Sequence, residues 1–359
     1  MQPIGSRKTD HLNLCATAAV GFRSRTTMLE QVQFIHDALP DLSWDDLDTG
    51  CALLGKRLRA PLVIAAMTGG TEEAREINRT LASIAEERGY AFALGSQRAM
   101  HIRATESRTY DVRDVAPTAV VLGNIGVVQA RGMSTSCVQE LVDTVGADGL
   151  CIHLNPAMEL VQPGGGDRDF RGGLDTIERL SRELRVPVVV KETGCGLSAR
   201  VGARVRAVGV RNVDVSGAGG TSWVGVEARR ASEAGDVQSS ALGEALWDWG
   251  IPTAASVAML SPLGFDAIIA TGGVATGLDV ARAIALGATA GGIARPVLKA
   301  LRSGGRTEVV AFFERIELEL RAAMLLTGSR DLASLRTAPR IVASELATWI
   351  ATSTETETP

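Results

Sequence analysis

Short apolar runs recur along the chain, and helix-like patterns separate most of them, for example at Glu72–Arg88, Gly173–Leu184 and Gly277–Leu286. The runs are Pro61–Met67, Ala91–Gly95, Ala119–Asn124, Gly149–Asn155, Pro187–Glu192, Asn212–Ser216, Asp266–Thr271 and Thr289–Ala294. Continuously apolar strands that alternate with helices are typical of a parallel sheet covered on both faces. Eight such units favour an α/β fold of the closed (β/α)8 TIM-barrel type over an open doubly wound sheet.

The segments that flank the eight units complete the predicted domain organisation. We expect one barrel domain over residues 1–350, with 1–60 as an N-terminal extension and closing helices within 300–350. The longest gap, between Ser216 and Thr271, indicates an insertion or a lid. Residues 351–359 are polar, and we expect them to form a disordered tail.

Composition narrows the class of protein. The hydrophobic fraction of 45% and the charged fraction of 22% are those of a soluble globular protein. A net charge of -4 and an aromatic content of 4% speak against a nucleic-acid surface and against binding to an anionic membrane. The five cysteines form no CxxC pair, and no apolar run approaches the roughly 18 residues of a membrane span. We therefore expect a cytoplasmic protein.

The segment Cys151–Gln162 gathers polar residues directly after a predicted buried strand. These are His153, Asn155, Glu159 and Gln162. Burying such groups without partners is costly, and barrel enzymes carry their chemistry on the loops after the strands, so the cluster indicates a site. Two alternatives remain open: His153 as a satisfied core histidine, and Glu159 as an exposed acid at a helix start rather than a ligand of a hard cation such as Mg²⁺.

Glycine loops follow the last two predicted strands, at Ala270–Gly277 and Gly291–Pro296. Paired loops at this place in a barrel can present backbone N–H groups to a phosphate, whereas the alternative is that they only make tight turns. The sequence Met67-Thr-Gly-Gly70 after the first strand allows backbone to lie against a flat ligand, although a plain turn is equally consistent. Gly95–Arg98, Asn124 and Ser216–Thr221 end other strands and can reach the same ligand.

Cationic residues occur at two further places. Lys191 ends the fifth strand, where it either pairs with Glu192 or another neighbour, or faces an electron-rich ligand. Near the N-terminus, Arg7 and Lys8 precede Asp10-His11, a combination suited to a diphosphate. A solvated basic terminus is the alternative interpretation.

In this order, the motifs resemble those of the type 2 isopentenyl diphosphate isomerases, which are FMN-dependent (β/α)8 enzymes. The matching segments are Arg7–His11, Met67–Gly70, Gly95–Arg98, Gly123–Gly126, His153–Pro156, Gly166–Phe170, Val190–Glu192, Gly219–Trp223, Trp249–Thr253, Thr271–Gly273 and Leu325–Gly328. The resemblance extends from about Arg7 to Ala347, and although each motif is modest, the ordered set is highly specific.

The resemblance implies three groups of site residues. FMN would be bound by Met67, Thr68, Gly69, Ser96, Asn124, Lys191, Ser216, Thr221, Gly272, Gly273 and Ala294. A prenyl diphosphate would be bound by Arg7, Lys8, His11, Arg98, His153, Asn155 and Gln162, with Mg²⁺ on Glu159. Members of the family need the flavin reduced, commonly by NADPH, although their isomerisation involves no net redox change. The resemblance also implies a homo-oligomer, a tetramer or an octamer.

Met158 departs from the family pattern, which has Gln immediately before the metal-binding Glu. A thioether cannot donate a proton, so the supporting role proposed for that amide is missing. Pro163–Asp167 also departs, being unusually rich in glycine. An isomerase that relies on the flavin N5 alone is the leading hypothesis. The alternatives are a flavin-dependent reductase or cyclase acting on another prenyl diphosphate, and a binding protein without catalytic activity.

Overall fold

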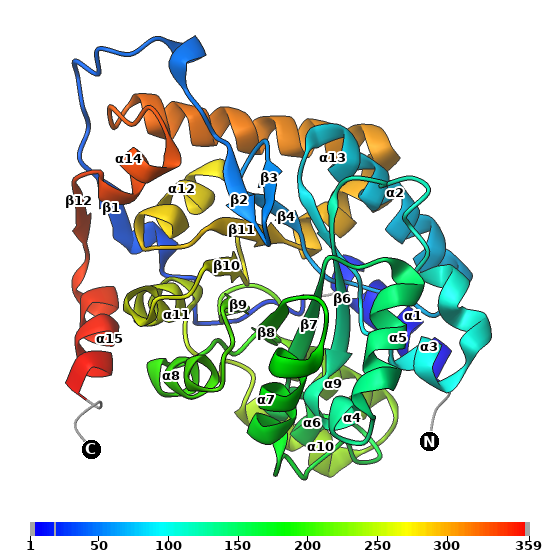
Figure 1. Ribbon diagram of the computed structural model, residues 1–359. Coiled ribbons are helices and arrows are strands. Elements are labelled where there is room, and N and C mark those ends of the chain that lie inside the picture. Colours follow the sequence, from blue (N-terminus) through cyan, green and yellow to red (C-terminus); the bar gives the residue numbers. More distant parts are fainter. Residues whose placement is uncertain (1–3, 18, 356–359) are drawn as a thin grey trace.

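Eight parallel strands form a closed barrel, as predicted (Figure 1). They are β4 (Leu62–Ile64), β5 (Ala91–Ala93), β6 (Val120–Gly126), β7 (Gly149–Leu154), β8 (Val188–Glu192), β9 (Asn212–Asp214), β10 (Ala267–Thr271) and β11 (Ala290–Ile293). Neighbours along the chain pair in parallel, and β11 pairs with β4 to close the circle. The computed structural model describes residues 4–17 and 19–355, with the backbone alone at 4–7, 9, 344 and 353–355.

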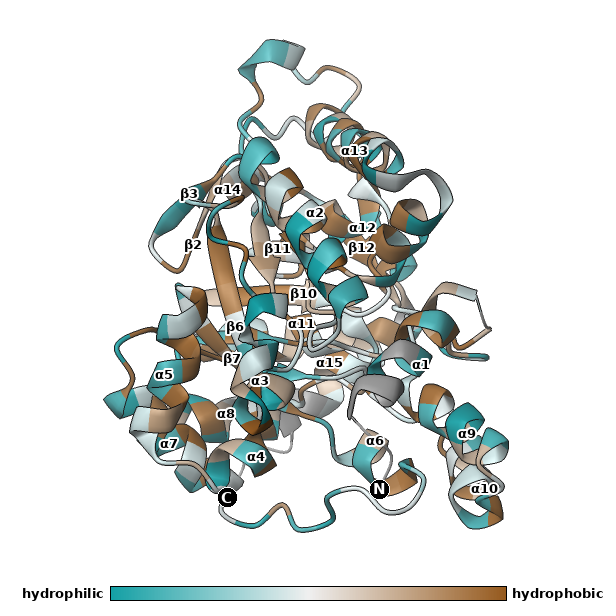
Figure 2. Cartoon of the chain, turned by 90° about the vertical axis from the view of Figure 1, so that its right-hand side faces the viewer, coloured by the Kyte–Doolittle hydropathy of each residue, from teal (hydrophilic) through white to brown (hydrophobic). Residues whose placement is uncertain are grey.

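Helices surround the barrel. They are α1 (Ile4–Thr17), α2 (Glu72–Arg88), α3 (Arg98–Ile102), α4 (Val127–Arg131), α5 (Thr135–Val145), α6 (Pro156–Val161), α7 (Gly173–Glu183), α8 (Ala199–Ala207), α9 (Trp223–Glu233), α10 (Val237–Ala245), α11 (Thr253–Leu260), α12 (Gly277–Ala285), α13 (Arg295–Leu325, kinked at Gly304 and Gly305), α14 (Leu332–Thr337) and α15 (Ser344–Glu355). The three helices predicted from periodicity correspond to α2, α7 and α12. The long gap before β10 contains α9, α10 and α11. Figure 2 shows the hydrophobic residues of β6 at the centre and hydrophilic residues on the helices outside it.

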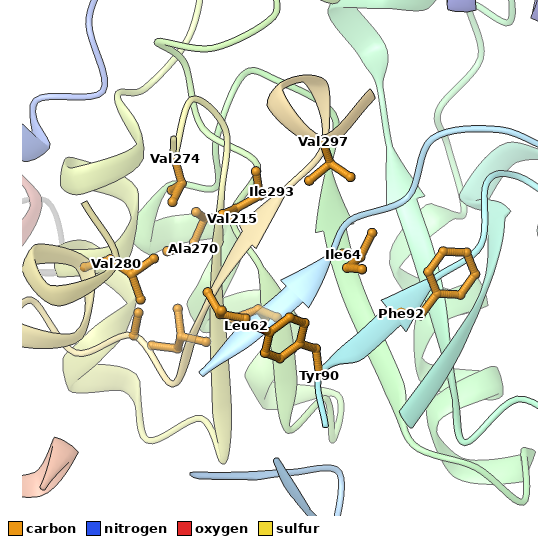
Figure 3. Packing of buried hydrophobic residues seen from close by; sticks show 14 of the residues in the cluster. Leu62, Ile64, Tyr90, Phe92, Val215, Ala270, Val274, Val280, Ile293 and Val297 are labelled. Carbon is orange, nitrogen blue, oxygen red and sulfur yellow. The ribbon is translucent and has the colours of Figure 1, made fainter. Parts of the chain in front are cut away.

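The alternation of side chains along each strand divides the core into two parts. One set of residues, including Val63, Leu122, Cys151 and Ile269, points into the barrel and forms an apolar cluster there. The other set, which includes Leu62 and Ile64 in Figure 3, packs outward against the helices. Strands buried on both faces explain why the sequence shows continuous apolar runs rather than alternation.

Short strands from the extensions complete the barrel. The antiparallel hairpin of β2 (Cys51–Leu53) and β3 (Lys56–Leu58) inserts Leu53 and Leu58 into the interior cluster. Strand β1 (Val32–Phe34) pairs with β12 (Arg340–Val342), so the N-terminal extension and the C-terminal segment meet (Figure 1). Among the described residues, no helix combines the length and hydropathy that crossing a membrane requires.

The expectation of a disordered tail over 351–359 stays a prediction, and the structure has helix in the first five of these residues. Helix α15 continues to Glu355, and Thr352 donates a hydrogen bond to the carbonyl of Thr348. The helix is anchored upstream because Leu346 is fully buried and Trp349 packs against the core. Because an upstream turn of the helix is buried, the helix extends into the polar segment that follows, which composition alone predicts to be a tail. Residues 356–359 lie outside the described part of the chain.

Candidate active site

A cavity of about 570 Å³ opens at the carboxyl ends of the barrel strands. Segments that follow all eight strands contribute to its lining, and α1 supplies a further wall through Lys8, His11, Leu12 and Cys15. The arrangement agrees with the expectation that the polar residues at the strand ends would converge.

The period of two along the strands positions the polar groups of this cavity. Asn124 lies two residues after Leu122, and the same spacing separates His153 from Cys151 and Lys191 from Val189. Each apolar member points into the barrel core, so each polar member points the same way one layer higher, at the cavity. The chain thus places polar side chains in a ring above a dry interior.

Hydrogen bonds determine the tautomer of His153. The Asn124 side chain donates from Nδ2 to the carbonyl of Leu94 at 3.1 Å, so its Oδ1 is the acceptor. That oxygen lies 2.8 Å from His153 Nδ1, which must therefore carry a proton. The interpretation of His153 as a core histidine is wrong in part, because the ring is only partly buried and also lines the cavity.

Glu159 is buried, with 5% of its surface exposed, and is not the exposed helix-start acid considered as an alternative. Asn155 Nδ2 donates to its Oε1 at 2.8 Å, and the backbone N–H of Asp167 donates to its Oε2 at 3.0 Å. Gly166 allows this loop to close, since a Cβ there would lie 2.5 Å from Glu159 Oε2. Met158 lies beside the pair, with its sulfur 3.9 Å from Asn155 Nδ2.

Lys191 pairs with a neighbouring carboxylate, the first of the two interpretations that the sequence leaves open, and that it faces a ligand stays a prediction. Its Nζ donates to the carbonyl of Glu192 at 2.7 Å and lies 3.7 Å from a carboxylate oxygen of Asp214, while the side chain also lines the cavity. Burial raises the pKa of Asp214 and raises the pKa of Glu192 to about 8, with Lys191 opposing both shifts. The buried Lys191 ammonium is thus held at the cavity by the main-chain carbonyl of Glu192 and the carboxylate of Asp214.

Two glycine loops that line the cavity pack backbone against backbone. A Cβ on Gly220 would lie 2.3 Å from the amide nitrogen of Gly273, and Gly219 and Gly273 have φ of +117° and +78°. The neighbouring helix α13 begins at the cavity after Ala294, and its N-terminus has no side-chain cap among the residues that the structure describes. Such exposed N–H groups and the helix dipole favour an anion. That these loops bind a phosphate stays a prediction.

Helix α1 is attached to α9 by a buried ionic network. His11 Nε2 lies 2.8 Å from Oε1 of Glu227, whose side chain is fully buried, and Arg230 donates to the other oxygen at 2.6 Å. The His11 ring also contacts Trp223 edge to face at 5.2 Å. The network places His11 at the cavity, in contrast to a solvated basic terminus.

The network predicts a pH dependence of stability. Burial by itself would raise the pKa of Glu227, but His11 and Arg230 outweigh it and hold that pKa below its ordinary value. A depressed folded-state pKa stabilises the fold above the unfolded value of about 4.3, and this contribution is lost as the pH falls. Glu227→Gln should lower the free energy of unfolding by roughly 1.5–3 kcal/mol at pH 7. Urea unfolding should show the deficit shrinking below pH 4. Glu233→Gln, exposed on the same helix, is the control; an equal deficit at both pH values would contradict the assignment.

Most of the residues selected from the sequence line the first cavity. They are Lys8, His11, Met67, Thr68, Ser96, Arg98, Asn124, His153, Asn155, Met158, Glu159, Lys191, Ser216, Thr221, Gly272, Gly273 and Ala294. Gln162 instead lines an adjacent cavity of about 770 Å³, which Arg98 and Glu159 also border. Gly69 is covered by the ring of Tyr110. The side chain of Arg7 lies outside the described part of the structure.

Several residues at this site escaped the sequence reasoning. Gln129 and Trp223 line the cavity, and Tyr110, Asp214 and Glu227 support its cationic residues. Asp214 could have been selected from the sequence. It lies two residues after Asn212 on a predicted strand, so the two polar side chains share one face of that strand. The others lie within helices or loops, and their partners are distant in sequence.

Comparisons with known proteins agree with the geometry. A model of the FMN-dependent dehydrogenase family matches residues 2–158 and 167–342. The chain is 44% identical over 337 residues to an isopentenyl-diphosphate delta-isomerase of Methanosarcina barkeri, covering 94% of this chain and 91% of that protein. It is 46% identical over 334 residues to the Synechococcus enzyme of the same name, with coverages of 92% and 94%.

The fold has counterparts among solved structures. A crystal structure of mandelate oxidase superposes with a TM-score of 0.64 at 17% identity, covering 95% of this chain and 99% of that one, which shows a shared fold. The family match and the identities above establish that the chain belongs to the FMN-dependent dehydrogenase family and, within it, to the type 2 isopentenyl-diphosphate delta-isomerases.

Proposed function

We propose that this protein interconverts isopentenyl and dimethylallyl diphosphates in isoprenoid biosynthesis, using FMN that NADPH keeps reduced in the cytoplasm. The observation that carries the proposal is the convergence of three features in one cavity. A glycine cradle with an uncapped helix N-terminus lies on one side, a buried ammonium at Lys191 lies at the floor, and the cationic α1 with Glu159 lines the remainder. A phosphorylated flat cofactor and a diphosphate need these features together.

The residues present fit FMN. The hydroxyls of Thr68 and Thr193 are buried and line the cavity, and neither has a hydrogen-bond partner in the described part of the chain. Buried hydroxyls are rarely left unpaired, so a polar ligand edge is the natural partner. Gly272 and Gly273 with Ala294 would hold the phosphate, while Lys191 would face the electron-rich part of the ring. Reduced FMN would supply the group that exchanges protons with the substrate carbons.

The residues also fit Mg²⁺ and a diphosphate. Mg²⁺ takes one or two carboxylates and fills its other positions with phosphate oxygens and water, so Glu159 alone suffices as the protein ligand. Asn155 and the N–H of Asp167 leave lone pairs on both carboxylate oxygens while fixing their orientation. Lys8, His11 and Arg98 would neutralise the diphosphate on the same side.

The chemistry follows from the properties of the substrate. An alkene is a very weak base, so its protonation creates a tertiary cation that only a dry and preorganised pocket stabilises. Fixing the diphosphate at α1 and Glu159 would direct the short hydrocarbon chain toward the part of the cavity that Lys191 and His153 line. The protein thus binds and orients the substrate and excludes water. The proton is exchanged at a carbon whose position the bound diphosphate determines.

Met158 removes a side-chain amide from this pocket. Its thioether is a weak acceptor and lies beside Asn155, where it contributes an apolar surface. Loss of one supporting acid–base group costs roughly 10²–10⁴ in rate without abolishing the reaction. We therefore propose that proton transfer here proceeds without an amide at this position.

Met158→Gln is expected to leave the fold unchanged and not to lower isomerase activity, because an amide would restore a polar partner beside Asn155. Steady-state rates with isopentenyl diphosphate would check this, with Leu160→Gln, an exposed change on the same helix and outside the cavity, as the control. A large loss of activity in Met158→Gln would mean that the shape of Met158 serves a different mechanism.

The proposed function itself is tested by incubating the FMN-loaded protein with isopentenyl diphosphate, Mg²⁺ and NADPH without oxygen. Appearance of dimethylallyl diphosphate, followed by chromatography, is the expected result. Its absence with flavin bound and reduced would favour a reductase or cyclase of another prenyl diphosphate. A purified protein that binds no FMN would overturn the enzymatic proposal.

A further inference from the structure

We propose that Tyr110 is a positioning residue that holds the Lys8 ammonium at the diphosphate end of the cavity. The inference rests on the proposed function, because it assigns to Lys8 the binding of a diphosphate. Tyr110 itself does not line the cavity and acts through Lys8.

The contacts form a closed triangle between α1 and the loop after β5. Lys8 Nζ donates to the hydroxyl oxygen of Tyr110 at 2.7 Å and to the carbonyl of Ser96 at 3.0 Å. The Tyr110 hydroxyl donates its own proton to the same Ser96 carbonyl at 2.7 Å. Because a phenol has one proton, this bond leaves the lone pairs of the oxygen for the ammonium. The direction of every hydrogen bond in the triangle is therefore determined.

Tyr110 is itself fixed. Its side chain is fully buried, and a Cβ on Gly69 would lie 2.1 Å from the ring, so the glycine is required for the ring to fit. The neighbouring Thr109 accepts a hydrogen bond from the N–H of Gly70 at 2.8 Å, and Asn78 donates to the Thr109 carbonyl at 3.0 Å. The two glycines after β4 thus leave the space that the ring of Tyr110 occupies.

A rigid acceptor matters because lysine is flexible. A free lysine side chain loses considerable rotamer entropy when it binds an anion, and preorganisation lowers that cost. Tyr110 and Ser96 hold Nζ where Arg98, the first residue of α3 and two positions after Ser96, also reaches the cavity. Lys8 belongs to a helix outside the barrel, so these hydrogen bonds also fix the position of α1 relative to the barrel.

The test uses inorganic pyrophosphate as the probe and isothermal titration of the FMN-loaded protein in the presence of Mg²⁺. Tyr110→Phe keeps the ring and removes the hydroxyl, with both the acceptor for Lys8 and the donor to Ser96, and we expect it to weaken binding roughly tenfold. Tyr90→Phe is the matched control, because the chain contains two tyrosines and Tyr90 is buried against Phe313, away from the cavity. This control should bind pyrophosphate like the wild type.

A double-mutant cycle separates positioning from a general structural effect. If Tyr110 acts through Lys8, the variant Lys8→Met with Tyr110→Phe should bind no more weakly than Lys8→Met alone. Additive losses, or wild-type affinity in Tyr110→Phe, would overturn the inference. If the wild type fails to bind pyrophosphate, the proposed function fails instead, so the two failures are distinguishable.

A second measurement covers the case in which Tyr110→Phe does not fold. In the Tyr90→Phe background, incorporation of fluorotyrosine modifies Tyr110 alone and makes its oxygen a poorer acceptor. We expect pyrophosphate affinity to fall with a singly fluorinated ring, whose phenol stays protonated; heavily fluorinated rings are not used, because their phenols ionise and a phenolate is a stronger acceptor than the phenol. Affinity that is independent of fluorination would contradict the assignment.

Discussion

Glu159→Gln should remove the Mg²⁺ dependence of substrate binding. The substitution takes away the negative charge of the proposed ligand, and even partners outside the coordination shell typically contribute 10- to 100-fold to metal affinity. We expect the affinity for Mg²⁺ in the presence of pyrophosphate to fall by at least roughly a factor of 100. Because both oxygens of Glu159 accept N–H donors, the new amide NH₂ also faces a donor, and the loop 163–167 should loosen.

Calorimetric titration of Mg²⁺ into the protein with pyrophosphate would measure the effect, and thermal unfolding would report the change in the loop separately. Glu140→Gln, an exposed change on α5, is the control and should behave as the wild type. Mg²⁺ dependence that survives in Glu159→Gln would remove this residue as the ligand. The site would then need a carboxylate from the neighbouring cavity, such as Asp167.

Gly220→Ala is the second change with a large expected effect. Its Cβ would lie 2.3 Å from the amide nitrogen and 2.7 Å from the Cα of Gly273, and backbone atoms cannot move aside as a flexible side chain can. Overpacking of this kind costs roughly 1–3 kcal/mol. If these loops bind the FMN phosphate, the same free energy is lost from FMN binding, and the affinity for FMN should drop roughly 10- to 100-fold.

Equilibrium dialysis with FMN would measure this affinity, and circular dichroism would confirm that the barrel is retained. Gly132→Ala is a matched control, because its Cβ would meet only one atom, at 3.6 Å, and its φ is negative. Unchanged FMN affinity in Gly220→Ala would show that the two loops are not the phosphate cradle.

The sequence predicted the barrel well because local pattern and tertiary structure agree there. Strands such as Val188–Glu192 are buried on both faces, so their apolar residues are contiguous. The residues at the carboxyl ends of such strands face the cavity and are polar there. The same logic places Asn124, His153 and Lys191 correctly. The order of motifs then identified the family without reference to geometry.

What the sequence could not predict depends on contacts between distant residues. Lys8 and Tyr110 are separated by 102 positions, and His11 and Glu227 by 216, so no local pattern connects them. Gln162 lies near Glu159 in sequence, yet α6 ends at Val161 and the chain turns toward the second cavity. Likewise, the polar residues that continue α15 are helical because upstream residues are buried, which composition does not reveal.

The central claim is isomerisation without net redox change, and the ratio of dimethylallyl diphosphate formed to NADPH consumed tests it most directly. The ratio should be measured over many turnovers without oxygen, with FMN and Mg²⁺ present. An isomerase needs NADPH only to reduce the flavin once, so the ratio should rise far above one as turnover proceeds. One NADPH consumed for each product molecule, with a reduced product in place of dimethylallyl diphosphate, would contradict the account.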